Sequence, residues 1–151
     1  MIQLTRRGAL NVSLGATAVA LFGRIPVAIA TPEETAQAIS KFTSGATPKA
    51  GKVSLTVPEI AENGNTVPLS VSVESPMTKE SHVKSVLIVA DGNPLPGVAT
   101  FYFSPMSGRA DTATRIRLAQ TQNVIAVAQM SDGTFYMDQK TVKVTIGGCG
   151  G

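Results

Sequence analysis

The chain has 151 residues and a formal net charge of +3, from 13 basic and 10 acidic residues, with one histidine and one cysteine. Three arginines (Arg6, Arg7 and Arg24) lie in the first 30 residues, which contain no acidic residue, so ten basic and ten acidic residues remain from Thr31 onward. A neutral body of this kind gives no support for binding to nucleic acid or to an anionic membrane. A single cysteine excludes a disulfide within the chain.

The N-terminal segment has the pattern of an export signal. Thr5-Arg6-Arg7-Gly8-Ala9-Leu10 precedes a weakly hydrophobic run over residues 12–22, and Ala28-Ile29-Ala30 fits the small-x-small pattern that a signal peptidase cleaves. Paired arginines before such a run indicate twin-arginine export in bacteria. The run is shorter than the roughly 20 residues that span a bilayer. We therefore expect residues 1–30 to be a cleaved signal and the mature chain to be periplasmic, without a membrane anchor.

A short helix is expected directly after this signal, over residues 32–42. Thr31 can cap it, Pro32 suits its first position, and Glu33 and Glu34 suit the positive end of the helix dipole. The apolar residues of this segment fall on one stripe, which predicts that the helix packs on the rest of the domain.

From Lys52 onward the hydrophobic period changes from helical to two, which is typical of β-strands. Seven or eight strands separated by Asn-, Asp- and Gly-rich turns predict an antiparallel β-sandwich, so that residues 31–146 form one all-β domain with a short N-terminal helix. Pro68 suggests an edge or a bulge in its strand. The expected strands cover residues 53–57, 67–73, 83–90, 98–103, 112–118, 124–130 and 141–146.

Side chains for catalysis or metal binding are sparse. His82 is the single histidine, and no second ligand follows it at the spacing of a metal site. The spaced methionines Met77, Met106, Met130 and Met137 are expected to fill the core. No nucleophile elbow, phosphate loop or dinucleotide fingerprint occurs. We expect no catalytic residue, no metal and no cofactor, and hence a protein that is not itself an enzyme.

The C-terminal tail is the one segment whose sequence indicates a reactive side chain. Cys149 has Gly147 and Gly148 before it and Gly150 and Gly151 after it, so residues 147–151 are expected to be a flexible arm that carries a thiol. Five extended residues span roughly 15 to 18 Å. An unperturbed thiol has a pKa of about 8.5 and is only a few per cent ionised at neutral pH. Such a thiol is better suited to carry a group between enzymes that activate it than to act alone.

The tail and several segments of the body resemble one known family. These segments are residues 58–68, Ser75-Pro76-Met77-Thr78, Asn93-Pro94, residues 114–119 and residues 128–133. Together with Gly147-Gly148-Cys149-Gly150-Gly151 they are similar to the SoxY family, the sulfur-carrier subunits of the bacterial thiosulfate-oxidising (Sox) system. The resemblance covers nearly the whole chain, and the tail is its most specific part.

This resemblance implies an immunoglobulin-like sandwich that forms a heterodimer with a SoxZ-like β-sandwich subunit. It implies that Cys149 is the covalent attachment site for sulfur, and that sulfur anions are its cargo. A SoxXA-type haem enzyme would join thiosulfate to the thiol, a SoxB-type hydrolase would release sulfate, and a sulfane dehydrogenase, where present, would oxidise the remaining sulfur.

Other functions are consistent with parts of the sequence. A structural or adhesive β-sandwich could use Cys149 for an intermolecular disulfide, although such a module does not need glycines that keep the thiol mobile. Small carriers that end in Gly-Gly use a terminal thiocarboxylate, which requires ATP and no cysteine. Prenylation requires cysteine fourth from the end, whereas here it is third.

Overall fold

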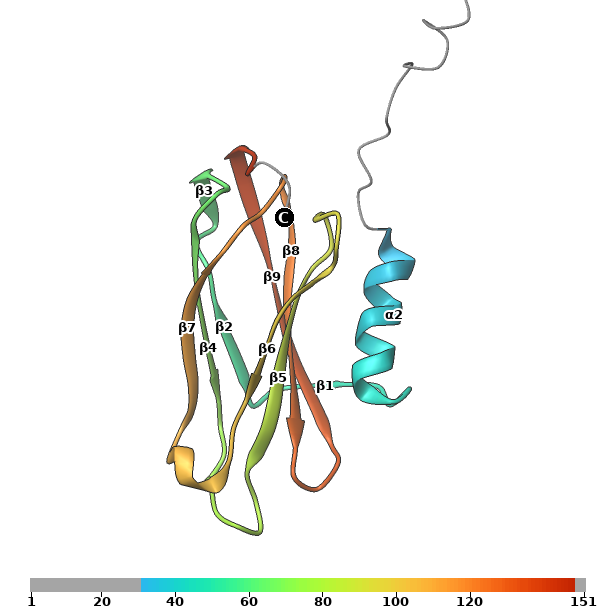
Figure 1. The fold of residues 1–151 in the computed structure, drawn as a ribbon, viewed down its shortest axis with the longest axis vertical. Helices are drawn as coiled ribbons and strands as arrows, with labels where there is room; N and C mark the ends of the chain where they lie inside the picture. The colour runs from blue at the N-terminus through green and yellow to red at the C-terminus, as the bar shows by residue number, and fades with distance from the viewer. Residues whose placement is uncertain (1–30, 149–151) are drawn as a thin grey trace, which may run out of the picture.

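Residues 31–148 are described by a computed structural model, and their strands form two sheets that pack face to face, with one helix outside the larger sheet (Figure 1). The smaller sheet has the strand order β2-β4-β7. The larger one has the order β1-β9-β8-β5-β6, and β3 also pairs with β9. The predicted β-sandwich is therefore confirmed.

The two sheets contain nine strands within residues 31–148. The smaller sheet consists of β2 (Val53–Thr56), β4 (Val67–Val73) and β7 (Ala110–Ile116). The larger sheet consists of β1 (Lys49–Ala50), β3 (Ile60–Asn63), β5 (Val83–Ala90), β6 (Gly97–Tyr102), β8 (Gln122–Met130) and β9 (Phe135–Ile146). A short 3-10 helix, η1 (Pro105–Ser107), connects β6 to β7.

Burial patterns follow from the position of each strand. Side chains of β4 alternate strictly between buried and exposed, because one face of the smaller sheet contacts the core and the other contacts solvent. In β5 the last six residues are all buried. One side of that strand faces the core through Val86 and Ile88, and the other faces the helix through Leu87 and Val89. The continuous apolar run of this segment therefore reflects a strand covered on both faces.

Helix α2 (Pro32–Thr43) begins where the sequence predicts and ends one residue later than expected. Thr31 and Glu34 form a capping box, and Ser44 ends the helix in the left-handed conformation. Ile39 and Phe42 pack on the outer face of the larger sheet. The ring of Phe42 meets that of Phe135 edge to face, with centroids 6.0 Å apart. No helix within residues 31–148 has the length and apolar character that crossing a membrane requires.

Three features differ from the sequence-based expectations, and the first is that β9 begins at Phe135, six residues before the expected start at residue 141. The strands β1 and β3 pair in parallel with β9 and were not expected, because they have only two and four residues and no clear alternation. Pro68 lies in β4, the middle strand of its sheet, rather than at a sheet edge. The ladder between β2 and β4 stops at Ser70, so this proline lies where one side of β4 has no neighbouring strand, and its missing N–H is tolerated.

Candidate functional site

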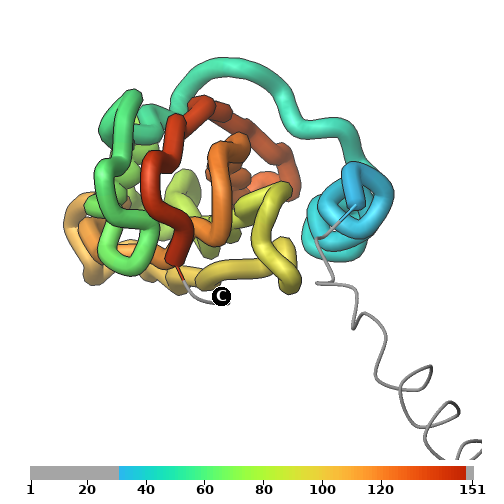
Figure 2. Tube along the Cα trace, turned by 90° about the horizontal axis from the view of Figure 1, so that it is seen from above, coloured from blue at the N-terminus to red at the C-terminus, as the bar shows by residue number. Residues whose placement is uncertain are grey.

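The expected functional tail begins at the C-terminal end of β9. Figure 2 looks onto this end of the sandwich and shows the end of β9 beside the turn between β3 and β4. Gly147 and Gly148 are described by the structure, whereas Cys149, Gly150 and Gly151 lie outside the described residues. The sulfur-attachment role of Cys149 therefore stays a prediction, and the site can be built only up to Gly148.

Three backbone hydrogen bonds hold the start of the tail against the sandwich. The N–H of Gly64 donates to the carbonyl oxygen of Ile146 (2.8 Å), and the N–H of Leu118 donates to the carbonyl oxygen of Gly64 (2.8 Å). The N–H of Gly148 then donates to the carbonyl oxygen of Leu118 (2.9 Å). We call Gly64, Leu118 and Gly148 the tail clamp. The clamp joins the β3–β4 turn, the segment after β7 and the tail at one point.

Glycine is required in the clamp because the three backbones lie so close together. A Cβ atom on Gly64 would overlap the carbonyl oxygen of Leu118 and would lie 2.7 Å from the nitrogen of Gly148. A Cβ atom on Gly147 would overlap the carbonyl oxygen of Ala119, and one on Gly148 would lie 2.9 Å from the carbonyl oxygen of Gly64. None of these contacts can be relieved by a side-chain rotation, because the opposing atoms belong to the backbone.

The clamp corrects the expected extent of the flexible arm. Gly148 is buried and hydrogen-bonded, and Gly147 packs against the carbonyl group of Ala119. In this structure buried Gly148 is therefore a close-packed part of the sandwich and exposed Gly147 contacts it, whereas the mobility of the arm stays a prediction. Cys149, Gly150 and Gly151 follow the clamp in the sequence.

A pair of buried amide side chains supports the segment that receives the tail. The side-chain amide of Asn93 donates to the carbonyl oxygen of Arg117 (2.9 Å), and its oxygen accepts the N–H of Ala119 (3.0 Å). The same oxygen accepts a hydrogen bond from Gln122 (3.0 Å), whose own oxygen accepts the N–H of Gly92 (2.7 Å). Asn93 and Gln122 are only 3% and 5% exposed. Buried amides whose nitrogen and oxygen atoms each have a hydrogen-bond partner fix the positions of the loops around them.

Sequence reasoning did not identify this amide pair as part of the site. In the sequence, the Asn93-Pro94 dipeptide contributes to the family resemblance but indicates no polar contact. Its partners lie 24 to 29 residues further along the chain, so no local pattern connects them.

The remaining sequence candidates lie away from the tail. His82 stands at the start of β5, at the opposite end of the sandwich, where its Nδ1 lies 3.1 Å from the carbonyl oxygen of Thr78. Within residues 31–148 no three metal-binding side chains come together. Met77 and Met130 are buried as expected, whereas Met106 is 96% exposed, because it lies in η1 outside both sheets.

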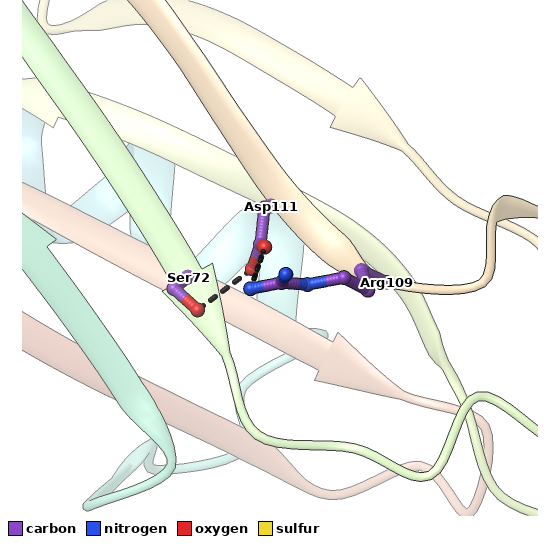
Figure 3. Close-up of polar contacts among 3 residues, drawn as sticks. All are labelled: Ser72, Arg109 and Asp111. Atoms are coloured by element: carbon purple, nitrogen blue, oxygen red, sulfur yellow. Dashed lines mark hydrogen bonds and ion pairs between the residues drawn. The ribbon is translucent and has the colours of Figure 1, made fainter.

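A polar hollow of about 400 Å³ lies on the outer face of the smaller sheet. Figure 3 shows the polar contacts on its floor. The hydroxyl of Ser72 donates to one oxygen of Asp111 (2.7 Å), and the guanidinium of Arg109 contacts the other oxygen (2.7 Å). These groups satisfy one another and are open to solvent. They lie where β7 begins, at the opposite end of that strand from the tail clamp, so they do not add to the candidate site.

Comparisons with known proteins place this fold in a family. The family described as "Sulfur oxidation protein SoxY" matches residues 36–149. The solved sulfur carrier protein SoxY from Chlorobium limicola f thiosulfatophilum is 30% identical, with 77% of this chain and 100% of that chain covered and a TM-score of 0.63. No curated protein gave a significant match.

Superoxide reductases (neelaredoxins) share the architecture at lower identity. One from Ignicoccus hospitalis is 19% identical over 76% of this chain and 92% of that chain, with a TM-score of 0.56. A putative superoxide reductase from Thermotoga maritima is 17% identical over 68% of this chain and 89% of that chain, with a TM-score of 0.52. These two likenesses concern the fold alone. The family match, which covers most of the chain and extends through Cys149, is the one that bears on identity: the chain belongs to the SoxY family of sulfur oxidation proteins.

Proposed function

We propose that this chain is a periplasmic sulfur carrier, which binds thiosulfate-derived sulfur covalently on Cys149 and presents it to separate Sox enzymes during the oxidation of thiosulfate to sulfate. The observation that supports this most directly is that the family match runs over residues 36–149 and so includes Cys149. The similar protein from Chlorobium limicola is itself named a sulfur carrier. In this proposal the chain is a carrier that enzymes act on, and it contributes no catalytic residue.

The proposed chemistry uses the nucleophilicity of a thiolate. In the loading step a bond forms between the sulfur of Cys149 and the terminal sulfur of thiosulfate, and a haem enzyme of the SoxXA type removes two electrons. In the release step water attacks the sulfonate sulfur, the bond between the two cargo sulfurs breaks, and sulfate and two protons leave. The outer sulfur then remains on Cys149 as a persulfide anion, which is the substrate for a sulfane dehydrogenase.

The tail clamp gives this chemistry a defined starting point. Because Gly148 is hydrogen-bonded to Leu118, the last described residue lies at the end of the sandwich where the β3–β4 turn and the segment after β7 meet. The described chain therefore ends at an extremity of the domain, and the proposal is that enzymes reach the thiol from there. Gly150 and Gly151, which follow Cys149 directly, have no side chain that would obstruct entry of the thiol into an active site.

The chain is also proposed to be exported in the folded state and to assemble with a second subunit. The paired arginines Arg6 and Arg7 support passage through the twin-arginine route, which delivers folded proteins. A SoxZ-like β-sandwich subunit is the proposed heterodimer partner, as the family membership suggests.

The proposal is tested by intact mass of the mature protein purified from thiosulfate-grown cells, before and after reduction. Sulfur-containing adducts that map to Cys149 and disappear on reduction are expected. Cys149→Ser should carry none and should support no thiosulfate oxidation, while its thermal unfolding stays unchanged. If Cys149 is found only bare or in disulfide-linked dimers, even after thiosulfate and the Sox enzymes are added, the structural β-sandwich would be favoured instead.

A further inference from the structure

Strand β6 forms one edge of the larger sheet, and one side of its backbone has no neighbouring strand. The order β1-β9-β8-β5-β6 ends there, and β7, the next strand along the chain, belongs to the smaller sheet. On the other side the N–H of Phe103 donates to the carbonyl oxygen of Lys84 in β5 (2.9 Å). Because the backbone groups of an antiparallel strand point alternately to its two sides, the N–H and C=O groups of Thr100 and Tyr102 point away from β5. Within residues 31–148 no strand pairs with these groups.

The side chains around this edge are typical of a protein interface. Residues 92–108 contain no charged side chain, and this is the longest such run from Thr31 to the end of the chain. Strand β6 contains neither lysine nor proline, the residues that commonly prevent an edge strand from pairing with another chain. Tyrosine and methionine are enriched where two proteins meet. Three of the five exposed large hydrophobic side chains within residues 31–148 lie in this run, namely Leu95 (72%), Tyr102 (80%) and Met106 (96%).

The other edge strands within residues 31–148 are protected against pairing. β7 contains charged side chains, among them Asp111. On β2 the N–H of Leu55 donates to the carboxylate of Asp138 in β9 (2.9 Å), so that edge already has a partner. β1 and β3 have only two and four residues, and each contains a charged residue. In this part of the chain β6 is therefore the edge strand that has neither charge nor cover.

The edge of β6 is complementary to itself. A second copy that is antiparallel and related by a two-fold axis at Phe101 has its Tyr102 opposite Thr100 of the first copy. Each such pair exchanges two N–H···O=C bonds, and the two-fold axis generates the pair twice. Phe101, which packs against the core, then lies opposite Phe101 of the second copy, and aromatic pairs across two strands are stabilising. No like charges meet, because neither strand carries a charge.

We propose that β6 pairs with β6 of a second copy of this chain, so that the larger sheets of two sandwiches join into one continuous sheet. The partner strand is recognised by its exposed backbone groups and by the absence of charge. This inference concerns assembly alone and does not rest on the proposed sulfur chemistry. A SoxZ-like subunit would then bind at another surface of the domain.

The pairing determines where the two tail clamps lie. Strand β6 follows the loop that contains Asn93, whose side chain holds the segment next to the clamp. A two-fold axis perpendicular to β6 reverses the direction of the strand in the second copy. The clamps of the two copies therefore lie at opposite ends of the dimer.

Sedimentation equilibrium of the mature chain tests the pairing, with a reductant present so that no disulfide links two copies. We expect a reversible monomer–dimer equilibrium. Thr100→Lys adds a charge at the free edge, and Ala113→Lys, the matched control, adds the same charge at an exposed position of β7. The dissociation constant should rise at least about ten-fold in Thr100→Lys and stay within about two-fold of wild type in the control. A wild-type chain that is monomeric up to about 0.5 mM, or an equal effect of the two lysines, would overturn the inference.

Opposite charges test the register of the two strands. Tyr102→Glu alone should also weaken the dimer. In the double variant Thr100→Lys/Tyr102→Glu each lysine lies opposite a glutamate of the other copy, so the dimer should be at least about three-fold tighter than in either single variant. This gain also shows that the single variants fold, because a chain damaged by either substitution would not recover the dimer. A double variant that is as weak as the single variants would contradict the two-fold register and overturn the inference.

Amide hydrogen exchange identifies the occupant of the edge. The N–H of Tyr102 should exchange slowly in concentrated solution and faster on dilution. The N–H of Phe103 is bonded to Lys84 within one copy, so its exchange should depend much less on concentration. If Tyr102 is protected only after a SoxZ-like subunit is added, the edge binds a different chain and pairing between copies is overturned.

Discussion

A single methyl group at Gly64 should release the tail from the sandwich. In Gly64→Ala the new Cβ atom would overlap the carbonyl oxygen of Leu118 and lie 2.7 Å from the nitrogen of Gly148. The backbone segments that contain Gly64, Leu118 and Gly148 must then move apart, so the three hydrogen bonds of the clamp lengthen or break. Each contributes a net 0.5 to 1.5 kcal/mol or so, which gives a loss of about 2 to 4 kcal/mol in the free energy of unfolding.

Gly97→Ala is the matched control for this variant. Gly97 lies in β6, its φ is not in the left-handed region, and a Cβ atom there would meet nothing within 4 Å. Both variants reduce the freedom of the unfolded chain by the same amount, so that contribution cancels in the comparison. Gly97→Ala should stay within about 0.5 kcal/mol of wild type, as surface substitutions usually do.

Urea unfolding measures the loss, and amide hydrogen exchange locates it. In Gly64→Ala the N–H groups of Leu118 and Gly148 should exchange faster than in wild type, whereas those in the middle of β8 should lose protection only to the extent that global stability falls. The reasoning would be refuted if Gly64→Ala and Gly97→Ala were equally stable and the N–H of Gly148 exchanged at the same rate in both.

Two further variants probe the loops and turns of the sandwich. Asn93→Ala should lower the free energy of unfolding by about 2 to 3 kcal/mol, because it leaves buried partners unsatisfied. The exposed Asn65→Ala is its control in urea unfolding, and equal stability of the two would contradict this. At Asp132, hydrogen bonds from the hydroxyl and N–H groups of Thr134 lower the carboxyl pKa below its usual 3.8. This stabilisation is present above pH 3.8 and is lost as the pH falls through the lowered pKa. The advantage of wild type over Asp132→Asn should therefore shrink between about pH 6 and pH 2.5, and a constant difference across that range would count against it.

Regular features of this fold could be predicted because their causes are local. The residues that cap α2, Thr31 and Glu34, lie within four positions of one another, so they indicate the start of this helix directly. The alternation of apolar and polar residues over Val67–Val73 identifies β4 in the same way. The strands β1 and β3 could not be predicted in this way. They exist because the long strand β9 offers a free edge to two short segments, and that edge depends on the whole sheet.

The tail shows a different limit of sequence reasoning. Glycine is found both where a chain must be mobile and where backbones pack too closely for a Cβ atom. Gly147 and Gly148 belong to the second class, but their partners Gly64, Leu118 and Ala119 lie 28 to 84 residues away in the sequence. In the sequence, the two glycines before Cys149 and the two after it look equivalent. Only the contacts at the end of the sandwich show that Gly147 and Gly148 lie against other backbone segments.

In the proposed function, the clamp also determines how close a partner enzyme has to come to the sandwich. Cys149 directly follows Gly148, so one peptide unit, about 3.8 Å from Cα to Cα, separates the thiol-bearing residue from the clamp. An enzyme that takes sulfur from this thiol therefore has to come close to the sandwich itself. The β3–β4 turn and the segment that carries Arg117 and Leu118 surround the point from which the tail emerges. In the proposed function these surfaces, and not the tail alone, meet the enzyme, so their shape and charge contribute to the choice of partner.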